Sequence, residues 1–132
     1  MISIVIPVYN EEENIPLLHE RLLKVLNSQD EHYEIIYVDD GSKDNSLNIL
    51  KNLKGNTKVV ELARNYGQHA AIFAGFSVVS GDKVITMDAD LQNPPEEIPK
   101  ILEKFNEGYD VIATVRQQRK DSIFRKFFSH LN

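Results

Sequence analysis

Two aspartates separated by one residue, Asp88 and Asp90, are the side chains of this sequence with the strongest potential for chemistry. They directly follow a strand-like run of mostly β-branched and apolar residues at 83–87, and at the fraying end of a strand both carboxylates can turn toward one point. Mg²⁺ and Mn²⁺ prefer carboxylate oxygens and accept phosphate oxygens and water as further ligands. The pattern predicts a metal site at Asp88 and Asp90, to which Gln92 could add a carbonyl oxygen. The alternative is that Asp88 caps a turn and Asp90 caps the next helix.

Two more polar clusters follow strand-like segments at residues 2–7 and 34–38. After the first segment, Tyr9 could stack on a nucleobase or lie at the edge of the core. Asn10 and Glu11 could bind a ligand or could only cap a helix. After the second segment come Asp39 and Asp40. One of these two could accept hydrogen bonds from a base or a ribose while the other caps the following turn.

Two side chains between Asp40 and Asp88, Arg64 and His69, could also bind a ligand. Arg64 could approach nucleotide phosphates or pair with a surface acid, and we expect the first. His69 is not expected to bind a metal, because no second His or Cys lies close to it in the sequence. The other three histidines, His19, His32 and His130, are predicted to be surface residues.

The segments around these clusters alternate between strand and helix patterns. Strands are predicted at residues 2–7, 34–38, 58–62, 83–87 and 110–115, and helices at 15–26, 47–53, 68–80 and from 94 to Gly108. Asn10 and Glu13 resemble a capping box for the first helix. The alternation predicts one α/β domain over residues 1–132, with a mostly parallel sheet and helices on both faces.

In such sheets ligands bind beyond the carboxyl ends of the strands, so the three clusters should meet at one edge. Like charges gathered there are costly unless a cation or a donor-rich ligand lies among them. The acids that would share this rim are Glu11, Asp39, Asp40, Asp88 and Asp90.

Composition narrows the class of protein. A chain of 132 residues with 42% hydrophobic and 27% charged residues is typical of one globular domain. It contains no cysteine, which excludes disulfides and thiolate metal sites. The net charge is −5, which argues against broad nucleic-acid binding. No secretory signal or membrane span is recognised, so we expect a soluble chain.

The last part of the chain differs from the acidic remainder. Residues 116–126 include five basic residues and one acid. Arg116 and Arg119 could grip a phosphate in bidentate fashion, or they could belong to a solvated basic face. Phe124, Phe127, Phe128 and Leu131 fall at helical spacing, which predicts a helix over residues 122–131 whose apolar stripe could belong to the core.

Four motifs, in this order, resemble those of the family 2 glycosyltransferases: IVIPVYNEE at residues 4–12, VDDGS at 38–42, ARNYG at 63–67 and MDADLQNPPE at 87–96. The resemblance spans about residues 2–128. The DLQNPP and RNYG elements are most similar to the polyprenyl-phosphate sugar transferases, the group that includes dolichol-phosphate mannose synthase and bactoprenol glucosyltransferases.

The resemblance implies a GT-A, Rossmann-like fold that binds a UDP- or GDP-linked sugar. It assigns Pro7, Tyr9, Asn10, Glu11 and Asp39 to the nucleoside pocket, and Asp88, Asp90 and Gln92 to the metal and diphosphate. Asp40 and Arg64 are further candidates for nucleotide-sugar contacts. Arg116 is implied as a ligand of the acceptor phosphate, and we expect Arg119 to assist it. Asp90 and Arg116 are then the candidate catalytic residues.

Catalytic domains of this family are longer than this chain, so we expect a donor-binding part truncated at its C-terminus. The implied full-length protein lies at the cytoplasmic face of a membrane, where its segment at residues 122–131 would meet anionic lipid as an interfacial helix.

The predicted reaction is inverting transfer of a sugar to a polyprenyl phosphate, in cell-envelope or glycan assembly. The metal would act as a Lewis acid on the leaving diphosphate. A phosphate monoester has a second pKa of about 6 and is already ionised at neutral pH, so a dedicated base is less necessary. The alternatives are transfer to a sugar hydroxyl and a fragment that binds nucleotide-sugar without turnover. A dinucleotide-binding dehydrogenase is not expected, because no Gly-x-Gly-x-x-Gly follows the first strand.

Overall fold

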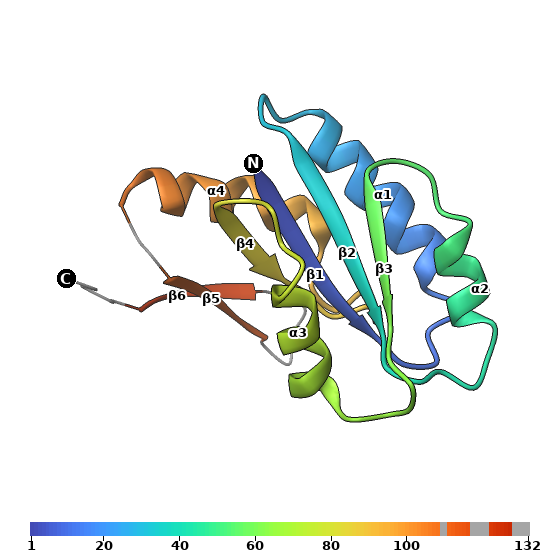
Figure 1. Cartoon of the computed structure of the whole chain (residues 1–132). Coiled ribbons are helices and arrows are strands. Elements are labelled where there is room, and N and C mark those ends of the chain that lie inside the picture. The colour runs from blue at the N-terminus through green and yellow to red at the C-terminus, as the bar shows by residue number, and fades with distance from the viewer. Residues whose placement is uncertain (109–110, 117–121, 128–132) are drawn as a thin grey trace.

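The computed structural model of the protein describes residues 1–108, 111–116 and 122–127. Four parallel strands form a sheet in the order β3-β2-β1-β4, with helices on both faces (Figure 1). The predicted α/β architecture is confirmed. The elements of this layer structure are β1 Ile2–Val8, α1 Ile15–Asn27, β2 Tyr33–Asp39, α2 Ser46–Lys51, β3 Thr57–Glu61, α3 Gln68–Phe76, β4 Lys83–Thr86, the 3₁₀ helix η1 Pro95–Glu97 and α4 Ile98–Asn106.

The larger core lies between the sheet and helices α1, α2 and α4. Successive side chains of a strand face opposite sides, so alternate residues of β1 point into this core. The helices meet them with stripes of period 3.6. The main contributors are Ile2, Ile4 and Ile6 from β1, Ile15, Leu18, Leu22 and Leu26 from α1, Leu50 from α2, and Ile98 and Leu102 from the segment after β4.

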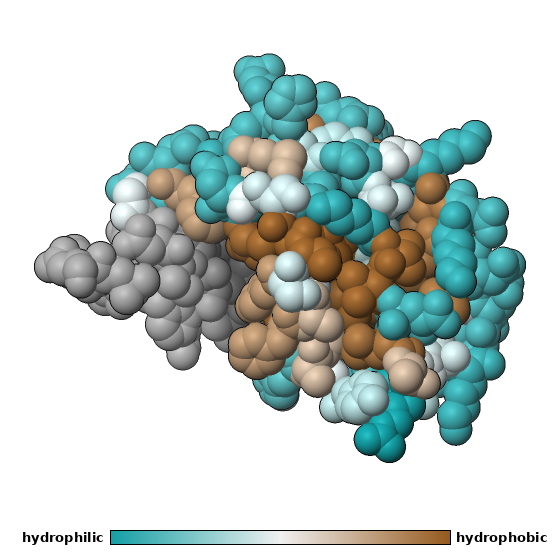
Figure 2. Space-filling view, in the orientation of Figure 1, coloured by the Kyte–Doolittle hydropathy of each residue, from teal (hydrophilic) through white to brown (hydrophobic). Residues whose placement is uncertain are grey.

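The opposite face of the sheet is covered by α3. Val5, Ile36 and Val38 pack there against Ala71. Figure 2 shows apolar side chains gathered on this side of the molecule. Gly75 lets the helix approach the sheet closely, because a Cβ at that position would lie 2.4 Å from Cγ1 of Val5.

We expect Gly75→Val to destabilise the protein by about 1–3 kcal/mol, because the added side chain overpacks the contact between α3 and β1. Val at Ala70 on the exposed side of the same helix is the matched control, and it should cost only the difference in helix propensity, about 0.5 kcal/mol. Urea denaturation of the two variants measures both effects. Equal midpoints for the two variants would contradict the close packing at Gly75.

A separate two-stranded antiparallel sheet follows α4. It consists of β5 Val111–Arg116 and β6 Ser122–Phe127, with Arg116 opposite Ser122 and Val111 opposite Phe127. The predicted strand at 110–115 is therefore confirmed, but the predicted helix at 122–131 is wrong over Ser122–Phe127. Pairing with β5 decides the conformation there, and Ile and Phe are also strand-favouring residues. Residues 128–131 and Arg119 lie outside the described part of the chain. No helix among the described residues is long and apolar enough to span a membrane.

Two local predictions are also wrong. Helix α1 begins at Ile15 with Asn14 as its N-cap and has no side-chain cap, so Asn10 and Glu13 do not form a capping box. His19 is not a surface residue. It is 5% exposed, and its ring contacts the Tyr37 hydroxyl through Nδ1 at 2.7 Å and the Lys54 carbonyl through Nε2 at 2.6 Å. A carbonyl can only accept, so Nε2 carries a proton, and in the neutral ring Nδ1 then accepts from the Tyr37 hydroxyl.

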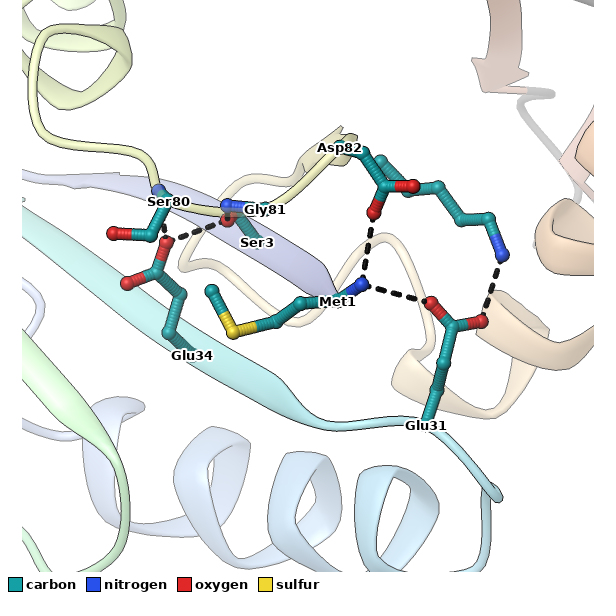
Figure 3. Close-up of polar contacts among 8 residues, drawn as sticks. Met1, Ser3, Glu31, Glu34, Ser80, Gly81 and Asp82 are labelled. Atoms are coloured by element: carbon teal, nitrogen blue, oxygen red, sulfur yellow. Dashed lines mark hydrogen bonds and ion pairs between the residues drawn. The ribbon is translucent and has the colours of Figure 1, made fainter.

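A polar network ties the amino ends of the strands together (Figure 3). Glu34 on β2 is 2% exposed and accepts hydrogen bonds from Ser3 Oγ and from the Ser80 N–H, both at 2.6 Å. Lys58 on β3 pairs with its second oxygen at 2.8 Å. Burial raises the pKa of Glu34, but the hydrogen bonds from Lys58, Ser3 and Ser80 outweigh it and hold the pKa below its ordinary value.

We expect Glu34→Gln to lower the free energy of unfolding at pH 7 by on the order of 1–2 kcal/mol, because hydrogen bonds to a charged group are lost. The folded-state pKa of Glu34 is depressed, so its stabilisation is complete above the ordinary value of 4.5 and is lost as the pH falls below it. The difference in the free energy of unfolding between wild type and Glu34→Gln should therefore decrease as the pH falls from 5 to 3. Glu20→Gln, at an exposed position, is the control. A margin that does not change with pH would contradict this assignment.

Candidate functional site

A cavity of about 350 Å³ opens at the carboxyl edge of the sheet, where the loops after β1, β2, β3 and β4 meet. Strands β2 and β3 lie on one side of β1, and β4 lies on its other side. The strand order therefore reverses between β1 and β4, and this place is the topological switch point of the sheet. The volume of the cavity is in the range of small-molecule binding sites. The cavity is lined by six predicted site residues, Pro7, Tyr9, Glu11, Asp40, Asp88 and Asp90, together with Val8, Asn65, Gly67, Gln68 and Ala89.

Asp88 and Asp90 reach the cavity from the loop after β4, while Ala89 between them is buried. Oδ1 of Asp88 accepts a hydrogen bond from Nε2 of Gln68 at 2.7 Å. Oδ1 of Asp90 accepts from the N–H of Gln92 at 3.1 Å. Asp90 therefore closes a local turn and lines the cavity at the same time. It does not cap the next helix, whose N-cap is Pro94 without a side-chain hydrogen bond, so that part of the alternative interpretation is wrong.

The chemistry of this donor set can be compared with the metal predicted from the sequence. Among the described residues, no three His, Cys, Asp or Glu side chains gather into an all-protein metal cage. Two carboxylates at an open cavity instead suit a hard cation that takes its remaining ligands from phosphate and water. Asp88 and Asp90 therefore fit a Mg²⁺ or Mn²⁺ ion that arrives with a diphosphate. Gln92 does not line the cavity, so its role as a ligand stays a prediction.

Asp39 and Asp40 are both buried, and their environments differ. Oδ2 of Asp39 accepts from the Ser42 N–H at 3.3 Å, whereas its Oδ1 has no hydrogen-bond partner among the described residues. A buried acceptor without a partner is costly, so this oxygen is a candidate for binding a donor from a ligand. Asp39 does not line the cavity, whereas the next residue, Asp40, does.

Asp40 holds the loop that follows β3. Its Oδ1 accepts from the N–H of Tyr66 at 2.8 Å, and its Oδ2 accepts from the N–H of Gly67 at 3.1 Å. Gly41 adopts φ +73°, and a Cβ there would lie 2.4 Å from the backbone of Arg64. The loop therefore sits directly on the Asp40-Gly41 turn. The guanidinium of Arg64 stacks over the ring of Tyr66 at 4.9 Å from its centroid and does not line the cavity.

Asn10 joins two of the loops that surround the cavity. It adopts φ 53°, its N–H donates to Ser42 Oγ at 2.9 Å, and its Oδ1 accepts from the Lys43 N–H at 2.8 Å. The N–H of Glu11 donates to Ser46 Oγ at 2.9 Å. These contacts fix the loop after β1 against the loop after β2. Glu11 lines the cavity, and Asn14 Nδ2 donates to its Oε2 at 2.7 Å.

Comparison with known proteins identifies the family. The model of the family described as "Glycosyl transferase family 2" matches residues 3–131. The chain belongs to glycosyltransferase family 2. The motifs that resembled this family in the sequence are those whose residues surround the cavity, and the sheet has the arrangement of its GT-A fold.

Solved structures of related family 2 proteins agree in fold. TarS 1–349 from S. aureus is 29% identical with a TM-score of 0.63, over 82% of this chain and 32% of that one. The same protein in complex with UDP-GlcNAc is 28% identical with a TM-score of 0.64, over 82% of this chain and 31% of that one. The mannosyltransferase PcManGT from Pyrobaculum calidifontis, in complex with GDP-Man and Mn²⁺, is 24% identical with a TM-score of 0.54, over 67% of this chain and 27% of that one. The chain thus spans about a third of the length of the TarS structure.

Sequence reasoning missed the contribution of the loop after β3 to the site. Asn65, Gly67 and Gln68 line the cavity, yet only Arg64 of that loop was predicted to bind. The predicted strand at 58–62 could have indicated this contribution, because a parallel strand there brings its following loop to the same edge as the three acidic clusters. Arg116 is the last residue of β5, and the structure leaves its predicted phosphate contact untested.

Proposed function

We propose that this chain is the donor-binding part of an inverting glycosyltransferase that moves a sugar from a nucleotide-diphospho-sugar to a polyprenyl phosphate. One observation carries the proposal. The Asp88 and Asp90 carboxylates, Tyr9 and Glu11 line one cavity at the switch point of the sheet, in a chain of family 2. The related TarS structure with UDP-GlcNAc supports a nucleotide-sugar as the ligand.

The nucleoside end of the donor fits the side of the cavity formed by the loops after β1 and β2. Tyr9 is 41% exposed and lines the cavity with its apolar neighbours Pro7 and Val8, which suits stacking against a base. Asp39 precedes the lining residue Asp40, and its buried Oδ1 has no hydrogen-bond partner among the described residues, so we assign it a ligand donor such as a base N–H or a ribose hydroxyl. Asp40 contributes by holding the loop that closes the opposite wall.

The diphosphate end fits the loop after β4, where Asp88 and Asp90 would hold Mg²⁺ or Mn²⁺. When bound, such an ion supplies Lewis-acid neutralisation of the charge that develops on the leaving diphosphate. The contribution of the protein is to fix the two carboxylates at one point. Gln68 restrains Asp88, and the turn closed by the Gln92 N–H restrains Asp90. Fixed groups of this kind stabilise the transition state without reorganising.

A lipid phosphate acceptor is favoured by the sequence of the loop after β4 and by the basic segment at residues 116–126. A polyprenyl phosphate attacks as an oxyanion that is already ionised near neutral pH, so the site must place it and need not deprotonate it. Arg116, at the end of β5, and Arg119 are the proposed phosphate ligands. The proposal places the full-length protein at the cytoplasmic face of a membrane, with its basic segment toward anionic lipid.

The test is thermal unfolding of this chain with UDP-, GDP- and dTDP-sugars, each with Mn²⁺ and with EDTA. A ligand that binds only the folded state stabilises it by RT ln(1 + [L]/Kd). We expect one nucleotide-sugar to raise the midpoint only when Mn²⁺ is present. No shift with any donor would contradict the proposal. Transfer assays on a longer chain, with a polyprenyl phosphate against free sugars, then distinguish the lipid acceptor from a sugar hydroxyl.

A further inference from the structure

A side chain outside the Asp88–Asp90 motif contacts it directly. Gln68 is the first residue of α3, and its Nε2 donates to Oδ1 of Asp88 at 2.7 Å across a separation of 20 residues. Both side chains line the cavity. We propose that Gln68 is a positioning residue that presents the Asp88 carboxylate to the divalent cation. This inference rests on the proposed function, because it assumes that Asp88 binds the cation.

The backbone of Gln68 is fixed from both sides. On the N-terminal side, Asp40 accepts the N–H groups of Tyr66 and Gly67, the two residues that precede it. On the C-terminal side, Ala71 and Gly75 hold α3 against β1 and β2. The backbone that carries the Gln68 side chain is therefore held in place. The hydrogen bond from its amide then favours one orientation of the Asp88 carboxylate.

The chemistry of the amide suits this role. A carboxylate can accept several partners at once, so a hydrogen bond to Oδ1 is compatible with a cation on the same group. An amide is neutral, so it orients Asp88 without cancelling the negative charge that attracts the metal. A lysine at the same position would cancel that charge and compete with the cation. Partners that orient metal ligands in this way are worth about 10–100-fold in metal affinity.

The experiment titrates MnCl₂ into the protein together with the nucleotide-sugar that stabilises it in thermal unfolding, with the nucleotide-sugar alone as the blank, and follows the free Mn²⁺ signal by electron paramagnetic resonance. Gln68→Ala should raise the Kd for Mn²⁺ about 10-fold or more while the unfolding midpoint without metal stays unchanged, because Gln68 is exposed. Gln68→Lys should weaken Mn²⁺ binding further than Gln68→Ala does. A change in side-chain shape without a change in charge would not produce this ranking of affinities. His69→Ala, at the next exposed position of the same helix, is the matched control and should bind Mn²⁺ like the wild type.

Asp88→Asn, measured in the same series, separates the positioning role of Gln68 from the existence of the metal site. If Asp88→Asn loses Mn²⁺ and Gln68→Ala keeps wild-type affinity, the positioning role is wrong and the proposed metal site stands. If Asp88→Asn binds Mn²⁺ like the wild type, the proposed metal site is wrong and the role of Gln68 falls with it. Equal losses in Gln68→Ala and His69→Ala would also overturn the inference, because the start of α3 and not the amide would then be responsible.

Discussion

Replacing Asp88 or Asp90 with Asn should remove the metal-dependent stabilisation of this protein by its nucleotide-sugar. Each substitution takes away one of the two carboxylate charges available to the cation, and amide oxygens are weaker ligands for hard cations. At a ligand concentration of 100 times Kd, wild type gains about 2.7 kcal/mol. If Kd rises 100-fold, the same concentration gives a gain of only about 0.4 kcal/mol. Thermal unfolding with Mn²⁺ and the donor measures the difference.

Asp30→Asn provides the matched control, since it makes the same chemical change at an exposed position outside the cavity. It should keep the full stabilisation by Mn²⁺ and donor. Full stabilisation in Asp88→Asn and in Asp90→Asn would exclude both residues as metal ligands. A loss in only one of the two variants would assign the cation to that carboxylate and would contradict the symmetric role proposed for the pair.

The second large effect is expected from Asp40→Ala. This change removes two hydrogen bonds to a buried carboxylate and leaves the N–H groups of Tyr66 and Gly67 without their acceptor. Hydrogen bonds to charged groups contribute about 1.5–3 kcal/mol each, and partial access of water to the loop lowers the total, so we expect a loss of about 2–4 kcal/mol. Donor binding should fall as well, because Gly67 and Gln68 line the cavity.

Urea denaturation and donor titration together test this prediction. Asp40→Asn is the informative companion, because it keeps the shape of the side chain and one of its two acceptor oxygens. It should show a smaller loss than Asp40→Ala in both measurements. If Asp40→Ala unfolds at the wild-type midpoint, the carboxylate does not hold the loop. If stability falls but donor affinity does not, the position of the loop after β3 has no bearing on binding.

Much of the fold could be predicted because its signals are local. Buried parallel strands appear as short apolar runs, and α1 carries a clear 3.6-residue stripe. The meeting of the acidic clusters followed from the rule that parallel strands present their carboxyl ends at one edge. That rule correctly brought Glu11 from one loop to the same cavity as Asp88 and Asp90 from another.

The errors have a common physical cause, which is that distant contacts overrode local pattern. Phe124 and Phe127 fit a helical face, but residues 122–127 pair with β5 instead. His19 is polar, yet it falls between Leu18 and Leu22 on the buried stripe of α1, and Tyr37 on β2 supplies the hydrogen bond that permits its burial. The contact between Gln68 and Asp88 joins two elements that no periodicity relates.

The strand order has a consequence for how the chain acquires its structure during synthesis. Strand β1 lies inside the sheet, and one of its two neighbours, β4, begins only at Lys83. The ribosome must therefore release most of the domain before β1 is enclosed on both sides. Until then the hydrogen-bonding edge of a largely apolar strand is open, and such edges pair readily with other chains. Nascent chains that stop short of Lys83 should aggregate, whereas chains that extend past Thr86 can complete this sheet.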